Sequence, residues 1–393
     1  MSVPSQAQML LPLLEVMATA GEHIRPGQCY ELIADKLGVS AEERTKRVPN
    51  GASTVNAFER TVRWVQQRAK LLGLIERVKD GWSVTPEGKQ RLTPAPARQP
   101  RVAFVTDRGM AIWGDAFDVP TILEAGSVRA IISSPPYPIL RKKSYGGITD
   151  EKTYVDWLTR LIEGWLPTLK PDGSIVLNLG DAWRPGTPTL STYIERLVIA
   201  LEDRLGLHLC QRLAWENPSK LPAPAQWVNI ERCRVKPSLE PVLWFSPSTR
   251  PYANNRSVLQ PYSESMRKRI ADGGEQLSVE RPSGYALAQG AFAQDNGGAI
   301  PGNLIRAANT ESNSRYIVDC KRHGLPVHPA RFPAALPEFF VRLLSEVGDL
   351  IVDFFGGSGK TAEVAEALDR RWILVELYRE FIEGAKLRFP NAT

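Results

Sequence analysis

The chain has 393 residues, of which 43% are hydrophobic and 23% charged, with a formal net charge of +6. The length predicts two or three domains, and the composition is typical of a soluble protein with a sizeable core. No apolar run approaches the roughly 20 residues that span a bilayer, and the four cysteines form no C-x-x-C pair, so we expect no membrane segment, no zinc site and a reducing, cytoplasmic location.

Residues 1–92 are predicted to form a small helical domain that ends in a hairpin. In the segment "NAFERTVRWVQQRAKLLGL", Phe58 and Val62 fall on one helical face while Arg60 and Arg63 fall outward. The following "LIERVKDGWSV" indicates two short strands around an Asp-Gly turn. Three helices and such a wing resemble winged-helix DNA-binding domains, in which the third helix enters the major groove. A docking or dimerisation module is the alternative.

A Pro-rich linker, 93–103, separates this domain from a region of different pattern. Strands and helices alternate over 104–216 and 326–393, which predicts an α/β protein with a doubly wound, Rossmann-like sheet. Between them, 217–325 is rich in Pro, Asn, Ser, Gly and Arg and has little periodicity. An irregular insertion of this length in a compact domain is usually functional or disordered, and its aromatic residues argue against simple disorder.

The stretch "DFFGGSGKT" follows a predicted strand and opens a predicted helix. Gly357 and Gly359 have the spacing of a dinucleotide-binding loop with Ala362 in last place, and Glu376 follows 19 residues after Gly357. An acid at that position would hydrogen-bond a ribose diol. An ATP-binding P-loop would need glycine where Phe354 stands, so the loop predicts an adenosyl ligand without specifying the chemistry.

A second motif, "IISSPPYP", places Ser134, Pro135, Pro136 and Tyr137 directly after a predicted buried strand. Ligands of open α/β sheets bind outside the carboxyl ends of the strands. The prolines donate no N–H, so carbonyls and the serine hydroxyl remain to accept hydrogen bonds from a planar amine, on whose ring the tyrosine would stack. A proline-rich turn that merely ends the strand is the alternative for this motif alone.

Together, S-P-P-Y and F-x-G-x-G resemble the two signature motifs of DNA amino-methyltransferases. The catalytic motif comes first and a variable segment separates the two, which is the order of the permuted β class. "WGDAFD" resembles the element that faces the cofactor's adenine in this class, and "HPARFP" its third cofactor element. "RKKSYGG" and "NPSKLPAPAQWVN" extend the likeness to modification methylases over 104–389. Serine in first place is the form associated with N4 of cytosine, whereas Asp or Asn is more usual for N6 of adenine.

The resemblance implies a sequence-specific DNA methyltransferase that uses S-adenosylmethionine, flips a cytosine out of the duplex and methylates its N4. The implied catalytic residues are Ser134, Pro135, Pro136 and Tyr137. The implied cofactor-binding residues are Asp115, His328, Arg331, Phe354, Gly356, Ser358, Gly359, Lys360, Thr361 and Glu376. The implied DNA-binding residues are Arg141, Lys142, Lys143, Lys220, Arg234 and Arg281, and 217–325 becomes the target-recognition region.

One position departs from the family pattern. The modification methylases that the chain resembles have an acid where "VLNLGDAW" has Asn178, and an amide cannot take a proton. Asp181 is the nearby alternative for proton release. A C5-cytosine reaction is disfavoured because it needs a Cys nucleophile, usually in a Pro-Cys pair, and no cysteine here follows a proline.

Several alternatives remain open from the sequence. An N6-adenine methyltransferase and a non-catalytic DNA-binding regulator on the same fold are the main ones. An RNA or small-molecule methyltransferase explains the N-terminal domain and the long insertion poorly. Double-stranded DNA is the expected partner. The permuted class suggests a homodimer, and the enzyme would act alone or beside a cognate restriction endonuclease with no stable complex between the two.

Overall fold

The structure, a computed structural model, describes residues 6–21, 23–50, 53–92, 99–138, 150–276, 279–280, 284, 286–310 and 314–393. The predictions for Arg141, Lys142, Lys143 and Arg281 lie outside the described residues. Among the described residues, no helix is both long and apolar enough to cross a membrane.

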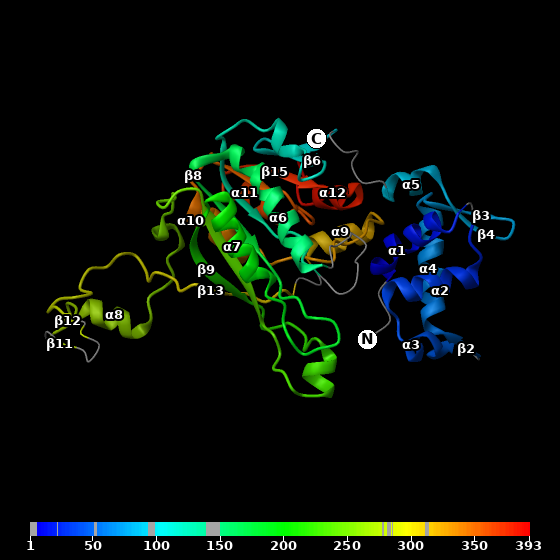
Figure 1. The fold of residues 1–393 in the computed structure, drawn as a ribbon, viewed down its shortest axis with the longest axis horizontal. Helices are drawn as coiled ribbons and strands as arrows, with labels where there is room; N and C mark the ends of the chain where they lie inside the picture. Colours follow the sequence, from blue (N-terminus) through cyan, green and yellow to red (C-terminus); the bar gives the residue numbers. More distant parts are fainter. Residues whose placement is uncertain are drawn as a thin grey trace.

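The N-terminal part has its own hydrophobic core and lies beside the rest of the molecule (Figure 1). Its elements are α1 (Gln6–Thr19), α2 (Pro26–Leu37), α3 (Ala41–Thr45), β1 (Arg47–Asn50), β2 (Ser53–Asn56), α4 (Ala57–Leu71), β3 (Ile75–Val78), β4 (Gly81–Val84) and α5 (Pro86–Leu92). The predicted hairpin is confirmed, because β3 and β4 pair antiparallel with Ile75 opposite Val84. The domain does not end there, since α5 follows the hairpin. Helices α3 and α5 and the hairpin β1–β2 were not predicted from the sequence.

Helix α4 has the two faces that its sequence predicts. It begins where the Asn56 side chain accepts a hydrogen bond from the Glu59 amide at 3.1 Å. Phe58 and Val62 are buried, whereas Arg60 and Arg63 are exposed. The far end of the helix touches the rest of the molecule, where Arg68 Nη2 donates to the Lys321 carbonyl at 2.6 Å.

A nine-stranded mixed sheet forms the centre of the larger part, in the order β13-β9-β10-β8-β7-β14-β15-β6-β5. The strands are β5 (Arg101–Val105), β6 (Gly109–Trp113), β7 (Val128–Ser133), β8 (Leu169–Asn178), β9 (His208–Glu216), β10 (Leu239–Ser246), β13 (Leu304–Arg306), β14 (Leu350–Asp353) and β15 (Arg371–Glu376). The pairs β7–β8, β7–β14, β14–β15 and β15–β6 are parallel. The predicted α/β sheet is therefore confirmed, with antiparallel strands β5 and β10 added.

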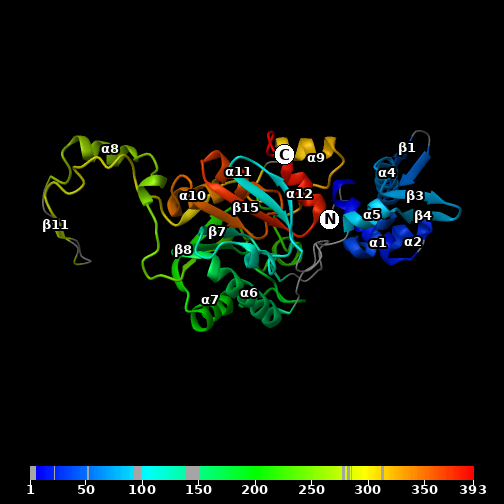
Figure 2. The same cartoon turned by 90° about the horizontal axis from the view of Figure 1, so that it is seen from above.

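Helices cover both faces of this sheet (Figure 2). On one face lie α6 (Glu151–Trp165) and α7 (Tyr193–Leu205), and on the other lie α10 (Ala335–Leu344), α11 (Lys360–Ala367) and α12 (Arg379–Lys386). Each face has a separate cluster of buried apolar side chains.

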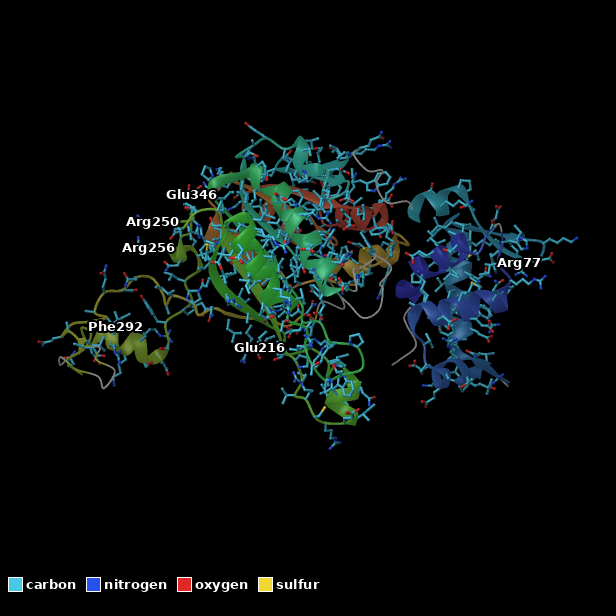
Figure 3. The ribbon with its side chains drawn as sticks, viewed as in Figure 1. Arg77, Glu216, Arg250, Arg256, Phe292 and Glu346 are labelled. Carbon is cyan, nitrogen blue, oxygen red and sulfur yellow. The ribbon has the colours of Figure 1, made fainter. Side chains whose placement is uncertain are left out.

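The segment 217–325 is less irregular than its sequence predicts. Within it, β10 pairs with both β8 and β9, and its Val242, Leu243 and Phe245 are buried, so the expectation of an irregular stretch was wrong there. The remainder includes α8 (Glu264–Ala271), a short hairpin of β11 (Val279–Glu280) with β12 (Ala286–Leu287), and α9 (Arg315–Arg322). Helix α8 and the hairpin form an excursion that extends away from the sheet in Figures 1 and 2. Figure 3 shows that Phe292 lies on this excursion.

Candidate active site

The two sequence motifs meet at one edge of the sheet. The S-P-P-Y motif follows β7 and the glycine loop follows β14, and these neighbouring strands run parallel. Their carboxyl ends therefore lie together, as expected for a ligand site in an open α/β sheet. Two adjoining cavities open there, and Ser134, Tyr137, His328, Ala330 and Phe355 line both.

The first cavity has a volume of about 300 Å³ and a largely aromatic wall. Trp157 and Phe355 line it, with their ring centroids 6.0 Å apart. Phe354 also lines it and is fixed from behind by stacking on Trp165, at 4.6 Å between centroids. Apolar walls of this kind suit a flat heterocycle, and polar groups at the margins then set its orientation.

Glu376 supplies the main polar group of the first cavity. It ends β15, where its Oε2 accepts a hydrogen bond from the Gly357 amide and its Oε1 one from the Tyr378 amide, both at 2.9 Å. Burial raises the pKa of this carboxyl to about 7, although these backbone amides act in the opposite direction. The group is held in place and still faces the cavity, as a ribose-binding carboxylate must.

Asp353 fixes the glycine loop to both strands. Its Oδ1 accepts hydrogen bonds from the Ser133 hydroxyl at 2.5 Å and the Phe355 amide at 3.0 Å, and its Oδ2 accepts one from the Thr361 hydroxyl at 2.7 Å. Burial raises the pKa of this carboxyl. Asp353 thus links the end of β7, the loop and the start of α11. Sequence analysis did not assign it a role, although its place as the last residue of β14, just ahead of the glycine loop, was a usable signal.

Two glycines of the loop are required by close packing. A Cβ on Gly356 would lie 2.3 Å from the Leu374 side chain. Gly357 has a φ of +48°, and a Cβ there would lie 2.9 Å from the His328 ring. The loop therefore lies flat between β15 and the "HPARFP" segment, and its backbone borders the cavities without side chains in between.

The second cavity, of about 220 Å³, lies on the side of β8 and β10. Ser134, Tyr137, Asn178 and Glu240 line it. The Tyr137 ring lies flat against Gly180, since a Cβ there would approach the ring to 2.5 Å. The Tyr137 hydroxyl donates to Glu240 Oε2 at 3.4 Å. This arrangement leaves room beside Ser134 for a planar polar group.

The structure brings most of the predicted site residues together. The first cavity is lined by Asp115, Ser134, Pro135, Pro136, Tyr137, His328, Phe354 and Glu376, and the second by Ser134, Tyr137, His328, Arg331, Gly356, Ser358 and Lys360. Gly359 and Thr361 are not among the described residues that line either cavity. Gly359 instead begins α11 with a φ of +75°, and the Thr361 hydroxyl is bonded to Asp353.

The predicted DNA contacts that the structure describes have protein partners. Lys220 Nζ forms an ion pair at 2.9 Å with Oε1 of Glu240, which lines the second cavity. The Arg234 guanidinium lies over the Trp183 ring, 5.1 Å from its centroid. Arg234 remains exposed in this position.

Asn178 and Asp181, the two positions considered for proton release, lie in different surroundings. Asn178 lines the second cavity, and its Nδ2 donates a long hydrogen bond of 3.4 Å to the Pro241 carbonyl. Asp181 is not among the described residues that line either cavity, and burial is the main cause that raises the pKa of its carboxyl. The carboxylate that does line the second cavity, Glu240, was not recognised from the sequence, because it lies in a stretch without clear periodicity.

The arrangement is suited to transfer between two bound groups. One cavity offers aromatic surfaces and a ribose-type carboxylate, and the other offers hydrogen-bond acceptors beside an aromatic ring. Because they share the Ser134 and Tyr137 side chains, groups bound in the two cavities would meet at the S-P-P-Y motif. Holding two reactants in contact and in a fixed orientation is the main requirement for methyl transfer.

Comparison with known proteins agrees with this geometry. The N6/N4 methyltransferase model, described as DNA methylase, matches residues 128–387. The chain is 41% identical to the type II methyltransferase M.PvuII of Proteus hauseri, over 73% of this chain and 85% of that protein. It is 25% identical to M.BglII of Bacillus subtilis, over 69% of this chain and 66% of that protein.

Among solved structures, the cytosine-N4-specific PvuII DNA methyltransferase superposes with a TM-score of 0.60 at 36% identity, covering 74% of this chain and 89% of that one. Residues 7–93 match a separate model, the Mrr N-terminal domain. That match accounts for the N-terminal part without establishing the winged-helix detail. The chain therefore belongs to the N6/N4 DNA methylase family and has an Mrr N-terminal domain ahead of its catalytic part.

Proposed function

We propose that this protein transfers a methyl group from S-adenosylmethionine to N4 of a cytosine in double-stranded DNA. The observation that carries the proposal is the meeting of the S-P-P-Y motif and the glycine loop at adjacent parallel strands, with one cavity on each side of Ser134. Serine in the first motif position favours cytosine over adenine. The 41% identity to M.PvuII supports the same choice.

The first cavity fits the adenosyl cofactor. Phe354, Trp157 and Phe355 would provide surfaces for the adenine, Asp115 would meet its amino edge, and Glu376 would accept hydrogen bonds from the ribose hydroxyls. Gly356, Ser358, Lys360, His328 and Arg331 border the neighbouring cavity and would surround the methionine part. S-adenosylmethionine, when bound, supplies an electrophilic methyl group on a sulfonium.

The second cavity would hold the methionine part at the glycine loop and the target base beside Ser134, Tyr137 and Glu240. Flipping a base out of the duplex costs a few kcal/mol, and stacking on Tyr137 offsets part of this cost. The Ser134 hydroxyl and the Pro135 carbonyl would accept the two hydrogens of the cytosine amine. These bonds turn the nitrogen lone pair, which is otherwise delocalised into the ring, toward the methyl group. Orientation then accounts for most of the acceleration.

Residues 217–325 would select the DNA sequence to be methylated, and the N-terminal domain would add further DNA contacts. The excursion that contains α8 extends away from the sheet (Figure 1) and would supply part of these DNA contacts. We expect a cytoplasmic enzyme that acts as a homodimer. It would serve either as the modification arm of a restriction–modification system or alone, without a stable complex with an endonuclease.

Ser134→Ala tests the assignment of the second cavity. Removing one hydrogen-bond partner of the reacting amine should lower kcat about 10²- to 10³-fold and leave cofactor affinity unchanged. Transfer of labelled methyl groups to unmethylated DNA measures kcat, and calorimetry measures cofactor binding. Ser127→Ala is the matched control, since this serine hydroxyl bonds the Glu124 carbonyl on the loop before β7. Wild-type kcat in Ser134→Ala would refute the assigned role.

Two rival functions predict different results in the same assay. An N6-adenine methyltransferase would transfer label into adenine, and the family model covers both chemistries. A non-catalytic regulator would bind the cofactor and DNA but transfer no label to any DNA.

A further inference from the structure

A carboxylate in the second cavity has no part in the mechanism above. Glu240 is the second residue of β10, and its side chain is only 13% exposed. Its Oε1 lies 2.9 Å from Lys220 Nζ, and its Oε2 accepts the Tyr137 hydroxyl at 3.4 Å. Ser134 lines the same cavity. A fixed negative charge therefore lies beside the proposed target base.

Methylation of an exocyclic amine requires such a group. The N4 lone pair forms the new N–C bond, the C–S bond breaks with its electron pair remaining on sulfur, and N4 must then lose one proton. A serine hydroxyl accepts a hydrogen bond but does not retain a proton at neutral pH. Arg331 and Lys360, which also line the cavity, offer hydrogen-bond donors and no acceptor. Asn178 is an amide and cannot serve.

We propose that Glu240 takes the proton that N4 of the cytosine loses. This inference rests on the proposed function. Lys220 stabilises the ionised carboxylate before the reaction, and solvent removes the proton afterwards. Other titratable groups around Glu240 are Tyr137, His328 in the same cavity, and Asp181 and Tyr193 farther out.

A substitution on the neighbouring strand β8 offers a way to place a carboxylate in the same cavity from a different position. Asn178 on β8 lies opposite Val242 on β10, and the amide of the next residue, Leu179, donates to the Pro241 carbonyl at 3.0 Å. Positions 178 and 240 thus border one cavity from adjacent strands. An aspartate at 178 would place a carboxylate in the same space when Glu240 has been neutralised.

The test is the single-turnover rate of methyl transfer, measured with enzyme in excess over DNA. Glu240→Gln should lower this rate about 100-fold or more, while DNA affinity, cofactor affinity and Tm change little. Glu240→Asp should recover part of the rate, and so should Asn178→Asp in the Glu240→Gln background. Glu202→Gln, an exposed position on α7, is the matched control. Formation of N4-methylcytosine by the wild type is measured first. If the proposed function is wrong, the wild type forms no such product. If only this inference is wrong, Glu240→Gln remains active.

Recovery of the rate by Glu240→Asp and by Asn178→Asp is a readout that a merely structural role would not produce. Should Glu240→Gln fail to fold, Lys220→Met, which removes the ion-pair partner of Glu240, should likewise lower the single-turnover rate. The inference would be overturned by a Glu240→Gln rate within threefold of wild type, by an unchanged rate in Lys220→Met, or by a loss seen with Asp181→Asn instead.

Discussion

At the scale of single residues, the site depends on carboxylates held in three different surroundings. Asp353 is fully enclosed and serves as a structural anchor for the hydroxyls and amide around it. Glu376 is buried by the protein but faces the cofactor cavity. Glu240 is paired with a lysine beside the base cavity. These surroundings give Asp353 an anchoring role, and they support the proposed roles of Glu376 in cofactor binding and of Glu240 in accepting a proton.

The raised pKa of Glu376 predicts a pH-dependent cofactor affinity. Ribose hydroxyls donate to the ionised form, so affinity should be highest above pH 7 and should fall by up to about tenfold per pH unit below it. Calorimetric titration between about pH 5.5 and pH 8.5 measures the effect. Glu376→Gln should bind more weakly and lose this dependence, which separates it from titration of the cofactor's own groups. A wild-type affinity that does not change with pH would contradict the assignment.

The raised pKa of Glu376 also affects the stability of the protein without cofactor, and there low pH is the favourable condition. Because the folded-state pKa lies above the ordinary glutamate value, the folded state binds this proton more readily than the unfolded state does. The free energy of unfolding contributed by Glu376 is therefore greatest at low pH and falls as the pH rises through about 7. Cofactor binding should offset this loss by stabilising the ionised form.

At the scale of elements, the glycine loop is a packed junction between β14, β15 and α11. Ser133, Asp353 and Thr361 connect it by hydrogen bonds, and Gly356 lets it approach Leu374. The loop therefore needs its particular sequence for packing as well as for ligand contact. A substitution here should affect stability even in the absence of cofactor.

A pair of glycine substitutions tests this packing. Gly356→Ala places a methyl group 2.3 Å from Leu374 and should lower the free energy of unfolding by about 1–3 kcal/mol, as overpacking does. Gly164→Ala lies within α6 with nothing within 4 Å, and should be neutral or stabilising by up to about 1 kcal/mol. Chemical denaturation of the cofactor-free protein measures both. Equal stability of the two variants would show that the loop is not packed as described.

At the scale of the whole molecule, the N-terminal domain joins the catalytic part through α4. The Arg68–Lys321 bond lies at this junction, and Gly324 approaches the Leu72 side chain so closely that a Cβ would lie 2.7 Å from it. The outer face of α4 remains open and carries Arg60, Arg63 and the 59% exposed Trp64. An aromatic ring among cations is a common composition for a DNA-contacting surface.

Charge reversal on α4 tests whether this face contacts DNA. Arg60→Glu with Arg63→Glu should weaken DNA binding and reduce the slope of log affinity against log salt by about 2, one for each lost phosphate contact. Cofactor affinity should not change, since the cavities lie in the catalytic part. Arg160→Glu, on the exposed side of α6, is the control. Unaltered DNA affinity and salt slope would favour the docking or dimerisation role for the domain.

Much of this architecture could be predicted from the sequence because its signals are local. Tyr137 after a buried strand and the glycine loop between a strand and a helix mark strand ends, and parallel strands bring such ends together. Contacts between residues that are distant in the sequence left no local signal of this kind. Glu240 reaches the site only because β10 inserts beside β8, and Asp353 acts through Ser133, 220 residues away. The proline- and serine-rich flanks of β10 concealed a buried strand whose partners specify it.

The identity of the modified base tests the central claim most directly. The purified full-length protein would be incubated with unmethylated genomic DNA and S-adenosylmethionine, and the DNA then digested to nucleosides for mass spectrometry. We predict N4-methylcytosine as the product. N6-methyladenine would keep the fold and the cofactor site but contradict the role given to Ser134, and the absence of any methylated base despite cofactor binding would contradict the proposed DNA methylation itself.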